Sequence, residues 1–96
     1  MGLSEIKEVL EKHKAELANK YHVSQIGVFG SYVRNEQTSQ SDVDILVDFS
    51  APISLFEFID MEEELFNLLN IKVELVSRKA LKPYIGEYIL KEVQMI

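Results

Sequence analysis

Two aspartates, Asp42 and Asp44, alternate with apolar residues in the stretch SDVDILV, residues 41–47. Residues two apart in a β-strand point to the same face, so we expect both carboxylates on one face and Val43 buried on the other. Two neighbouring carboxylates repel each other unless a cation lies between them. With oxygen atoms as the only ligands, the expected cation is Mg²⁺ or Mn²⁺ and not zinc. An Asp-x-Asp pair alone is common by chance and usually marks a solvated strand face.

A Gly-Ser pair, Gly30 and Ser31, follows the apolar stretch that ends at Phe29. Glycine lets the backbone turn where no side chain blocks a close approach. The hydroxyl of Ser31 and the N–H groups of a following helical turn then form an anion site. Arg34 lies one helical turn after Ser31 and offers a forked donor to phosphate, although such an arginine is also typical of a solvated surface. An anion site, a spacer and an acidic pair in this order are much rarer than any one of them.

The order Gly30-Ser31, a spacer of ten residues and Asp42-Val43-Asp44 resembles the signature of the nucleotidyltransferase superfamily related to the DNA polymerase β palm domain. Within that superfamily, GSYVR followed by SDVDILV resembles the minimal nucleotidyltransferase (MNT) domains. These domains are commonly the antitoxins of HEPN–MNT toxin–antitoxin pairs. The resemblance spans nearly the whole chain and implies a polymerase β palm-like fold.

A third acidic residue, Glu74, lies within the alternating stretch IKVELV, residues 71–76. A lone glutamate in such a strand is more often a surface residue. The resemblance implies otherwise, because the family places its third carboxylate on a strand of this kind after the intervening helix. That position is often aspartate in the family, and the extra methylene of glutamate moves the carboxylate by about 1.5 Å.

The resemblance implies nucleotidyl transfer from ATP with two Mg²⁺ ions held by Asp42, Asp44 and Glu74. It also implies that Gly30 and Ser31 grip the β- and γ-phosphates, and Arg34 is expected to add a further phosphate contact. Glu74 is expected to serve the metal that activates the incoming hydroxyl and to take its proton. For an MNT antitoxin the implied acceptor is a tyrosine of its HEPN ribonuclease partner, which AMP transfer blocks.

Two other functions are compatible with the same residues. A non-catalytic antitoxin would keep the fold and neutralise its toxin by binding alone, and Glu74 together with an apolar C-terminus leaves room for that alternative. A small-molecule adenylyltransferase of the antibiotic-modifying kind usually needs a second helical domain to hold the acceptor. No such domain is present in these 96 residues.

The composition indicates one domain, residues 1–96, with a single modest core. Sixteen acidic residues against ten basic ones give a net charge of -6, which argues against broad nucleic-acid binding. The acidic surface suits a basic protein partner, and a homo-oligomer is also possible. The chain has no cysteine and no membrane-spanning apolar run, so a cytoplasmic location is expected.

The periodicity predicts an α/β fold in which a small mixed sheet carries helices on one side and the site on the other. Ser4 is expected to cap the first helix, Ser54 with Glu57 has the spacing of a capping box that opens the second, and Pro83 is expected to start the last. A basic cluster at Arg78 is expected to face solvent. The predicted elements are a helix to about residue 20, strands Val23–Phe29 and Val43–Phe49, a helix to Leu69, a strand Ile71–Val76 and a last helix from Pro83.

The helices are also expected to present apolar faces, and Asn70 is expected to stop the second helix in the left-handed conformation. The expected stripe of the first helix is Ile6, Val9, Leu10, His13 and Leu17. The expected core face of the second helix is Leu55, Phe58, Ile59, Leu65, Phe66 and Leu69, and the expected packing residues of the last are Tyr84, Ile85, Tyr88 and Ile89.

Overall fold

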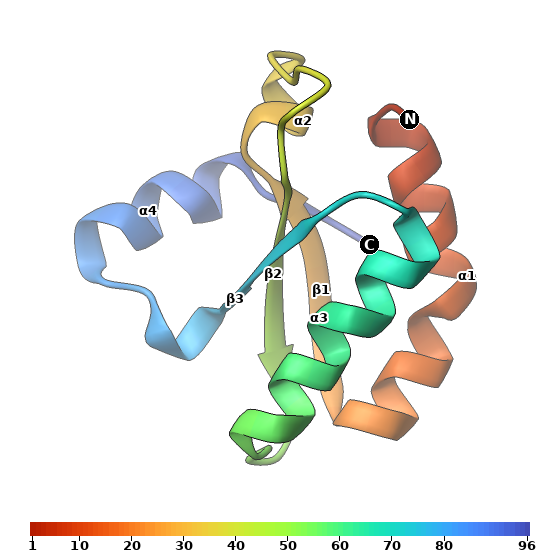
Figure 1. Ribbon diagram of the computed structural model, residues 1–96. Coiled ribbons are helices and arrows are strands. Elements are labelled where there is room, and N and C mark those ends of the chain that lie inside the picture. The colour runs from red at the N-terminus through yellow and green to blue at the C-terminus, as the bar shows by residue number, and fades with distance from the viewer.

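The computed structural model describes all residues from Met1 to Ile96 and shows a mixed sheet between helices (Figure 1). The predicted α/β class is confirmed, and the three longer strands match their predicted positions within two residues. In chain order the elements are α1 (Leu3–Tyr21), β1 (Val23–Phe29), α2 (Ser31–Arg34), β2 (Val43–Phe49), α3 (Leu55–Leu69), β3 (Val73–Ser77), the 3₁₀ turn η1 (Arg78–Ala80), α4 (Pro83–Glu92) and β4 (Gln94–Met95).

The strand order in the sheet is β3-β2-β1-β4. Strand β1 runs antiparallel to both β2 and β4, whereas β2 and β3 run parallel and are joined by the crossover helix α3. The short edge strand β4 was not predicted, because two residues carry no readable periodicity. It approaches β1 closely at Gly27, where an added Cβ would lie 2.8 Å from the sulfur of Met95.

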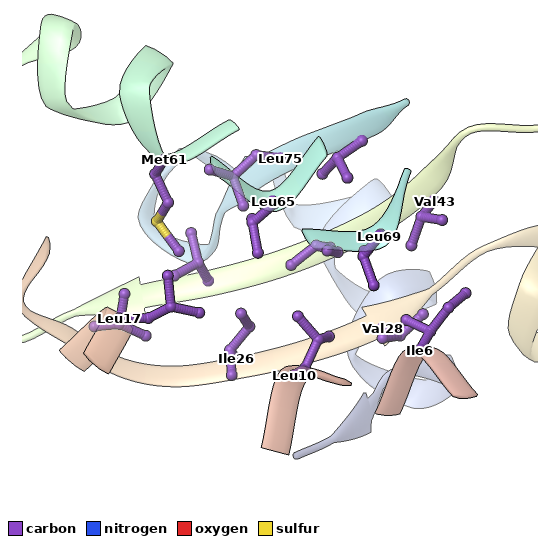
Figure 2. Packing of buried hydrophobic residues seen from close by; sticks show 14 of the residues in the cluster. Ile6, Leu10, Leu17, Ile26, Val28, Val43, Met61, Leu65, Leu69 and Leu75 are labelled. Atoms are coloured by element: carbon purple, nitrogen blue, oxygen red, sulfur yellow. The ribbon is translucent and has the colours of Figure 1, made fainter. Parts of the chain in front are cut away.

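One face of the sheet holds the core, which α1 and α3 cover together (Figures 1 and 2). Alternate residues of β2 point into it, and Val43, Ile45 and Val47 are fully buried. The predicted stripe of α1 is confirmed, because Ile6, Leu10 and Leu17 are fully buried. The helices contribute the buried residues Ile6, Leu10, Leu17, Tyr21, Met61, Leu65 and Leu69 to this core.

The ends of α3 follow the predicted chemistry. The Ser54 side chain accepts a hydrogen bond from the Glu57 N–H at 3.1 Å, and the Glu57 carboxylate accepts one from the Ser54 N–H at 3.0 Å. Asn70 ends the helix in the left-handed conformation, as expected. At α1 the prediction was wrong by two residues. Gly2 is its N-cap in place of Ser4, and the Gly2 N–H donates to the carboxylate of Glu5.

Two predicted apolar faces differ from those in the structure. In α3 the side chains of Leu55 and Phe66 were expected in the core and are instead exposed, because the buried stripe passes through Met61. In α4 only Ile89 among the expected packing side chains is buried, whereas Tyr84 and Tyr88 are more than four-fifths exposed. Apolar composition alone therefore did not fix how either helix is rotated against the sheet.

The opposite face of the sheet carries α4, which corrects the expectation of helices on one side only (Figure 1). A second, smaller cluster joins Phe29 of β1, Leu46 of β2 and Ile89 of α4. These residues alternate with those of the main core, so the two clusters lie on opposite faces. No helix of the chain is long and apolar enough to cross a bilayer.

Candidate nucleotide-binding site

A cavity of about 700 Å³ lies between α4 and the face of the sheet that α4 covers. It brings together four of the six predicted site residues, Gly30, Arg34, Asp44 and Glu74, which come from three separate stretches of the chain. Apolar side chains form the rest of the wall together with one further acid. The remaining lining residues are Phe29, Val76, Leu81, Tyr84, Ile85, Tyr88, Ile89 and Glu92.

Asp44 and Glu74 lie side by side because they are register partners on the parallel strands β2 and β3. Each stands one residue away from buried core positions, so strand alternation directs both towards the cavity. The adjacency of Asp44 and Glu74 that the family resemblance implies is therefore present. It follows from the parallel register, which no single stretch of sequence contains.

The pKa of Asp44 is raised from 3.8 to about 6. Burial is the largest cause, followed by the charge of Glu74 and a hydrogen bond that protonated Asp44 donates to it. The charge of Asp42 acts in the same direction, and Arg34 opposes it weakly. The negative charges at the site are thus not balanced by positive ones, and a bound divalent cation would reduce the repulsion between the carboxylates.

Asp42 and Ser31 do not line this cavity. Asp42 precedes β2 by one residue and lies in a neighbouring hollow that the loop from Gln37 to Ser41 also lines. The three acids do not form a ready three-ligand metal cluster in this structure. Their donor set nevertheless fits Mg²⁺, because all ligands are carboxylate oxygens and the charges of Asp42 and Glu74 both disfavour ionised Asp44.

Gly30 adopts a backbone conformation with φ 81° and ψ -153°, which residues with a side chain rarely reach. A Cβ at this position would overlap the carboxylate of Asp44. The carbonyl of Gly30 accepts hydrogen bonds from the N–H groups of Val33 and Arg34, which form the single turn α2. Glycine therefore allows the chain to turn directly against the acidic pair, as predicted.

Glu92 at the end of α4 is a site residue that the sequence did not reveal. Its Oε2 accepts a hydrogen bond from the Gly30 N–H at 2.9 Å, and its Oε1 accepts one from Arg34 Nη1 at 2.6 Å. Arg34 also donates through Nε to Glu36 at 2.6 Å. The pKa of Glu92 is lowered, because its bonds to Arg34 and Gly30 outweigh the opposing effect of burial. A contact across 62 residues leaves no local sequence pattern.

The basic cluster does not take part in the site. Arg78 and its neighbours Lys79 and Lys82 are exposed and do not line the cavity. The Arg78 guanidinium instead lies 3.4 Å from the side-chain oxygen of Gln25. Arg34 is therefore the one basic side chain that lines the cavity, in agreement with the solvated position expected for the cluster.

The family model of the nucleotidyltransferase domain matches residues 10–96, which include every element of the cavity. The chain belongs to the nucleotidyltransferase domain family. This nucleotidyltransferase is 50% identical over 93 residues to the protein adenylyltransferase MntA of Thermococcus cleftensis, with 97% of this chain and 94% of the relative covered. It is 53% identical over 88 residues to a candidate protein adenylyltransferase of Methanocaldococcus jannaschii, with 91% and 90% covered.

Solved structures agree with the family assignment. A candidate minimal nucleotidyltransferase superposes on this chain with a TM-score of 0.84 at 30% identity, covering 98% of this chain and 95% of that chain. A chain from a Shewanella oneidensis complex of a tri-AMPylated HEPN toxin with an MNT antitoxin gives a TM-score of 0.69 at 18% identity, covering 94% and 70%. At that identity the second likeness shows the fold alone. The predicted resemblance to the MNT domains is confirmed.

Proposed function

We propose that this nucleotidyltransferase transfers AMP from ATP, with Mg²⁺, to a tyrosine hydroxyl of a HEPN ribonuclease toxin and thereby acts as its antitoxin. The observation that carries the proposal is the pair Asp44 and Glu74 beside the Gly30 turn, on a chain half identical to a protein adenylyltransferase. The complex of an MNT antitoxin with a tri-AMPylated HEPN toxin supports the choice of partner.

Asp42, Asp44 and Glu74 are the residues that would hold Mg²⁺. When bound, the ions supply positive charge that neutralises the triphosphate and polarises the α-phosphorus. The Gly30 N–H and the Arg34 guanidinium bind the β- and γ-phosphates, and Ser31 at the start of α2 adds its hydroxyl. These contacts orient the nucleotide so that pyrophosphate leaves in line with the attacking oxygen.

Glu74 receives the proton of the tyrosine hydroxyl as its oxygen forms a bond to the α-phosphorus. The bond from that phosphorus to the bridging oxygen breaks, and pyrophosphate departs with the electron pair. Asp44 lies beside Glu74, and the charge of Glu74 helps to raise the pKa of Asp44 to about 6, after burial as the largest cause.

The test is incubation with labelled ATP, Mg²⁺ and the product of the neighbouring gene. The wild type is expected to label the partner, and Asp42→Ala with Asp44→Ala is expected to abolish labelling. Asp48→Ala is the matched control, because Asp48 lies on the same strand outside the cavity and its loss should leave labelling intact. Labelling that survives the double substitution contradicts the proposal.

A non-catalytic antitoxin is the second candidate, and one observation favours it. The two donors assigned to phosphate are both bonded to Glu92, and the three acids are not gathered as a metal cluster. This candidate predicts that the Asp42→Ala, Asp44→Ala variant still protects cells from the toxin. The enzymatic proposal predicts that protection disappears together with labelling.

A further inference from the structure

We propose that the carboxylate of Glu92 occupies the position that the phosphates of the nucleotide take when the nucleotide binds. It keeps the two donors, the Gly30 N–H and the Arg34 guanidinium, occupied until a triphosphate displaces it. Glu92 thereby determines which anions enter the site and how tightly they bind. This inference rests on the proposed function, because it assigns a specificity-determining residue to the same nucleotide site.

The hydrogen bonds of Glu92 carry the inference. Its two carboxylate oxygens are divided between a backbone donor at 2.9 Å and a guanidinium donor at 2.6 Å. A phosphate group binds the same two kinds of donor in the same bridging way. The carboxylate and a phosphate therefore compete for the Gly30 N–H and for Arg34 Nη1, and the two cannot be bound there together.

The charges lining the cavity strengthen this competition. Asp44, Glu74 and Glu92 face a single basic residue, Arg34, which is also paired with Glu36. An incoming polyphosphate thus meets no unpaired cation on the cavity wall, and Glu92 repels it in addition to blocking its donors. Removing this one charge makes the potential at the anion site more favourable for phosphate.

Glu92 can leave its position without unfolding α4. The helix is attached to the sheet through Ile89, which packs on Phe29 and Leu46, and the following strand β4 pairs with β1. Neither attachment involves the carboxylate of Glu92. The Arg34–Glu92 pair is half-exposed on the arginine side, and ion pairs of that kind contribute little to stability. Rotation of the Glu92 side chain is therefore enough to free both donors.

The experiment measures the binding of inorganic tripolyphosphate with Mg²⁺, and of ATP with Mg²⁺, by titration calorimetry. The variants are Glu92→Gln and Glu92→Ala, and the matched control is Glu87→Gln, which removes the same charge from an exposed position of α4. We expect both Glu92 variants to bind each ligand about tenfold more tightly, the scale of removing one nearby like charge in a partly screened site. Glu87→Gln should stay within about twofold of the wild type.

A second readout follows the amide resonance of Gly30 by NMR during the titration, because a merely structural role of Glu92 predicts that the ligand leaves this resonance unmoved. Tripolyphosphate with Mg²⁺ should shift this resonance in the wild type, because phosphate replaces the carboxylate as its acceptor. Glu92→Ala should shift the resonance before any ligand is added. Equal or weaker binding in both Glu92 variants, or a Gly30 resonance that ligand does not move, overturns the inference.

Neither readout needs an acceptor protein, so the two proposals can fail separately. Tighter binding in the Glu92 variants without any AMP transfer by the wild type refutes the proposed function and leaves the role of Glu92 standing. AMP transfer by the wild type with unchanged affinity in both variants refutes the role of Glu92 alone. Glu92→Gln keeps the shape of the side chain and so provides a folded variant if Glu92→Ala does not fold.

Discussion

The two faces of the sheet differ in almost every physical respect, although they share the same strands. The face under α1 and α3 is apolar and closed, and Val43 and Ile45 on it are fully buried. The face under α4 carries Asp44 between those two residues, with Glu74 beside it and a cavity above. Because side chains alternate along β2, its odd-numbered residues Val43 and Ile45 pack in the core. Asp44 between them points to the opposite face and lines the cavity.

This difference indicates that one face of the sheet mainly stabilises the fold and the other carries the residues of the candidate site. Burial of apolar side chains on the core face stabilises the folded state. The site face offsets part of this stabilisation, because it holds acids that repel each other. Large-to-small substitutions on the core face are therefore expected to lower stability, whereas removing the charge of Asp44 on the site face is expected to raise it.

The largest expected effect is on the core face. Leu65→Ala removes a fully buried side chain between α3 and the sheet and should lower the free energy of unfolding by about 3 kcal/mol. Tyr88→Ala on the site face, where the side chain is 83% exposed, should change it by less than about 0.5 kcal/mol. Urea denaturation followed by circular dichroism measures both. Equal losses from the two variants would show that α4 is held by more than the Ile89 cluster.

An intermediate effect is expected at the turn that joins the two faces. Gly30→Ala should cost about 2 kcal/mol, because alanine is strained at φ 81° and its methyl group meets the carboxylate of Asp44. The same substitution in an Asp44→Ala background should cost less, since the obstructing carboxylate is absent. A double-mutant cycle of urea midpoints measures the difference. An identical cost in both backgrounds would place the whole effect in the backbone conformation.

The smallest effect has the opposite sign and lies on the site face. The pKa of Asp44 is raised to about 6, so the folded state binds its proton more tightly than the unfolded state does. Stability therefore falls as pH rises from about 4 through about 6, and the full penalty is present above that range. Asp44→Asn should stabilise the protein at pH 7.5 by about 1 kcal/mol, after allowance for solvent screening.

The control for this prediction is the pH itself. Near pH 3.5 Asp44 is protonated in the folded state and mostly protonated in the unfolded state, so most of the advantage of Asp44→Asn should vanish there. Asp48→Asn, on the same strand, should show no comparable gain at pH 7.5. Thermal unfolding at both pH values measures these differences. A stability gain that persists unchanged at pH 3.5 would mean that the asparagine acts through packing and not through charge.

The sequence predicted the features that are encoded locally. The alternation around Asp44, the turn at Gly30 and the capping box at Ser54 each follow from residues within a few positions of one another. Glu74 was found through the family resemblance, which places a third carboxylate on an alternating strand after the intervening helix, whereas the strand pattern alone favours a surface residue. Its contact with Asp44 then follows from the parallel register.

The features that the sequence could not give depend on how distant elements dock. The rotation of α3 puts Met61 in the core and leaves Phe66 outside, although both are apolar. The exposed Tyr88 and the bonds of Glu92 depend on how α4 crosses the sheet after η1, which no local spacing fixes. Asp42 shares its strand parity with Asp44 yet lies in a neighbouring hollow, because it precedes the first residue of β2.

The most direct test of the central claim compares two positions of the label in ATP with the wild type and Glu74→Gln. We expect the HEPN partner to acquire label from the α-phosphate and none from the γ-phosphate, because AMP is transferred and pyrophosphate leaves. Glu74→Gln, which retains the side-chain shape but not the charge, should abolish the labelling. Label from the γ-phosphate, or full α-labelling by Glu74→Gln, would contradict the account.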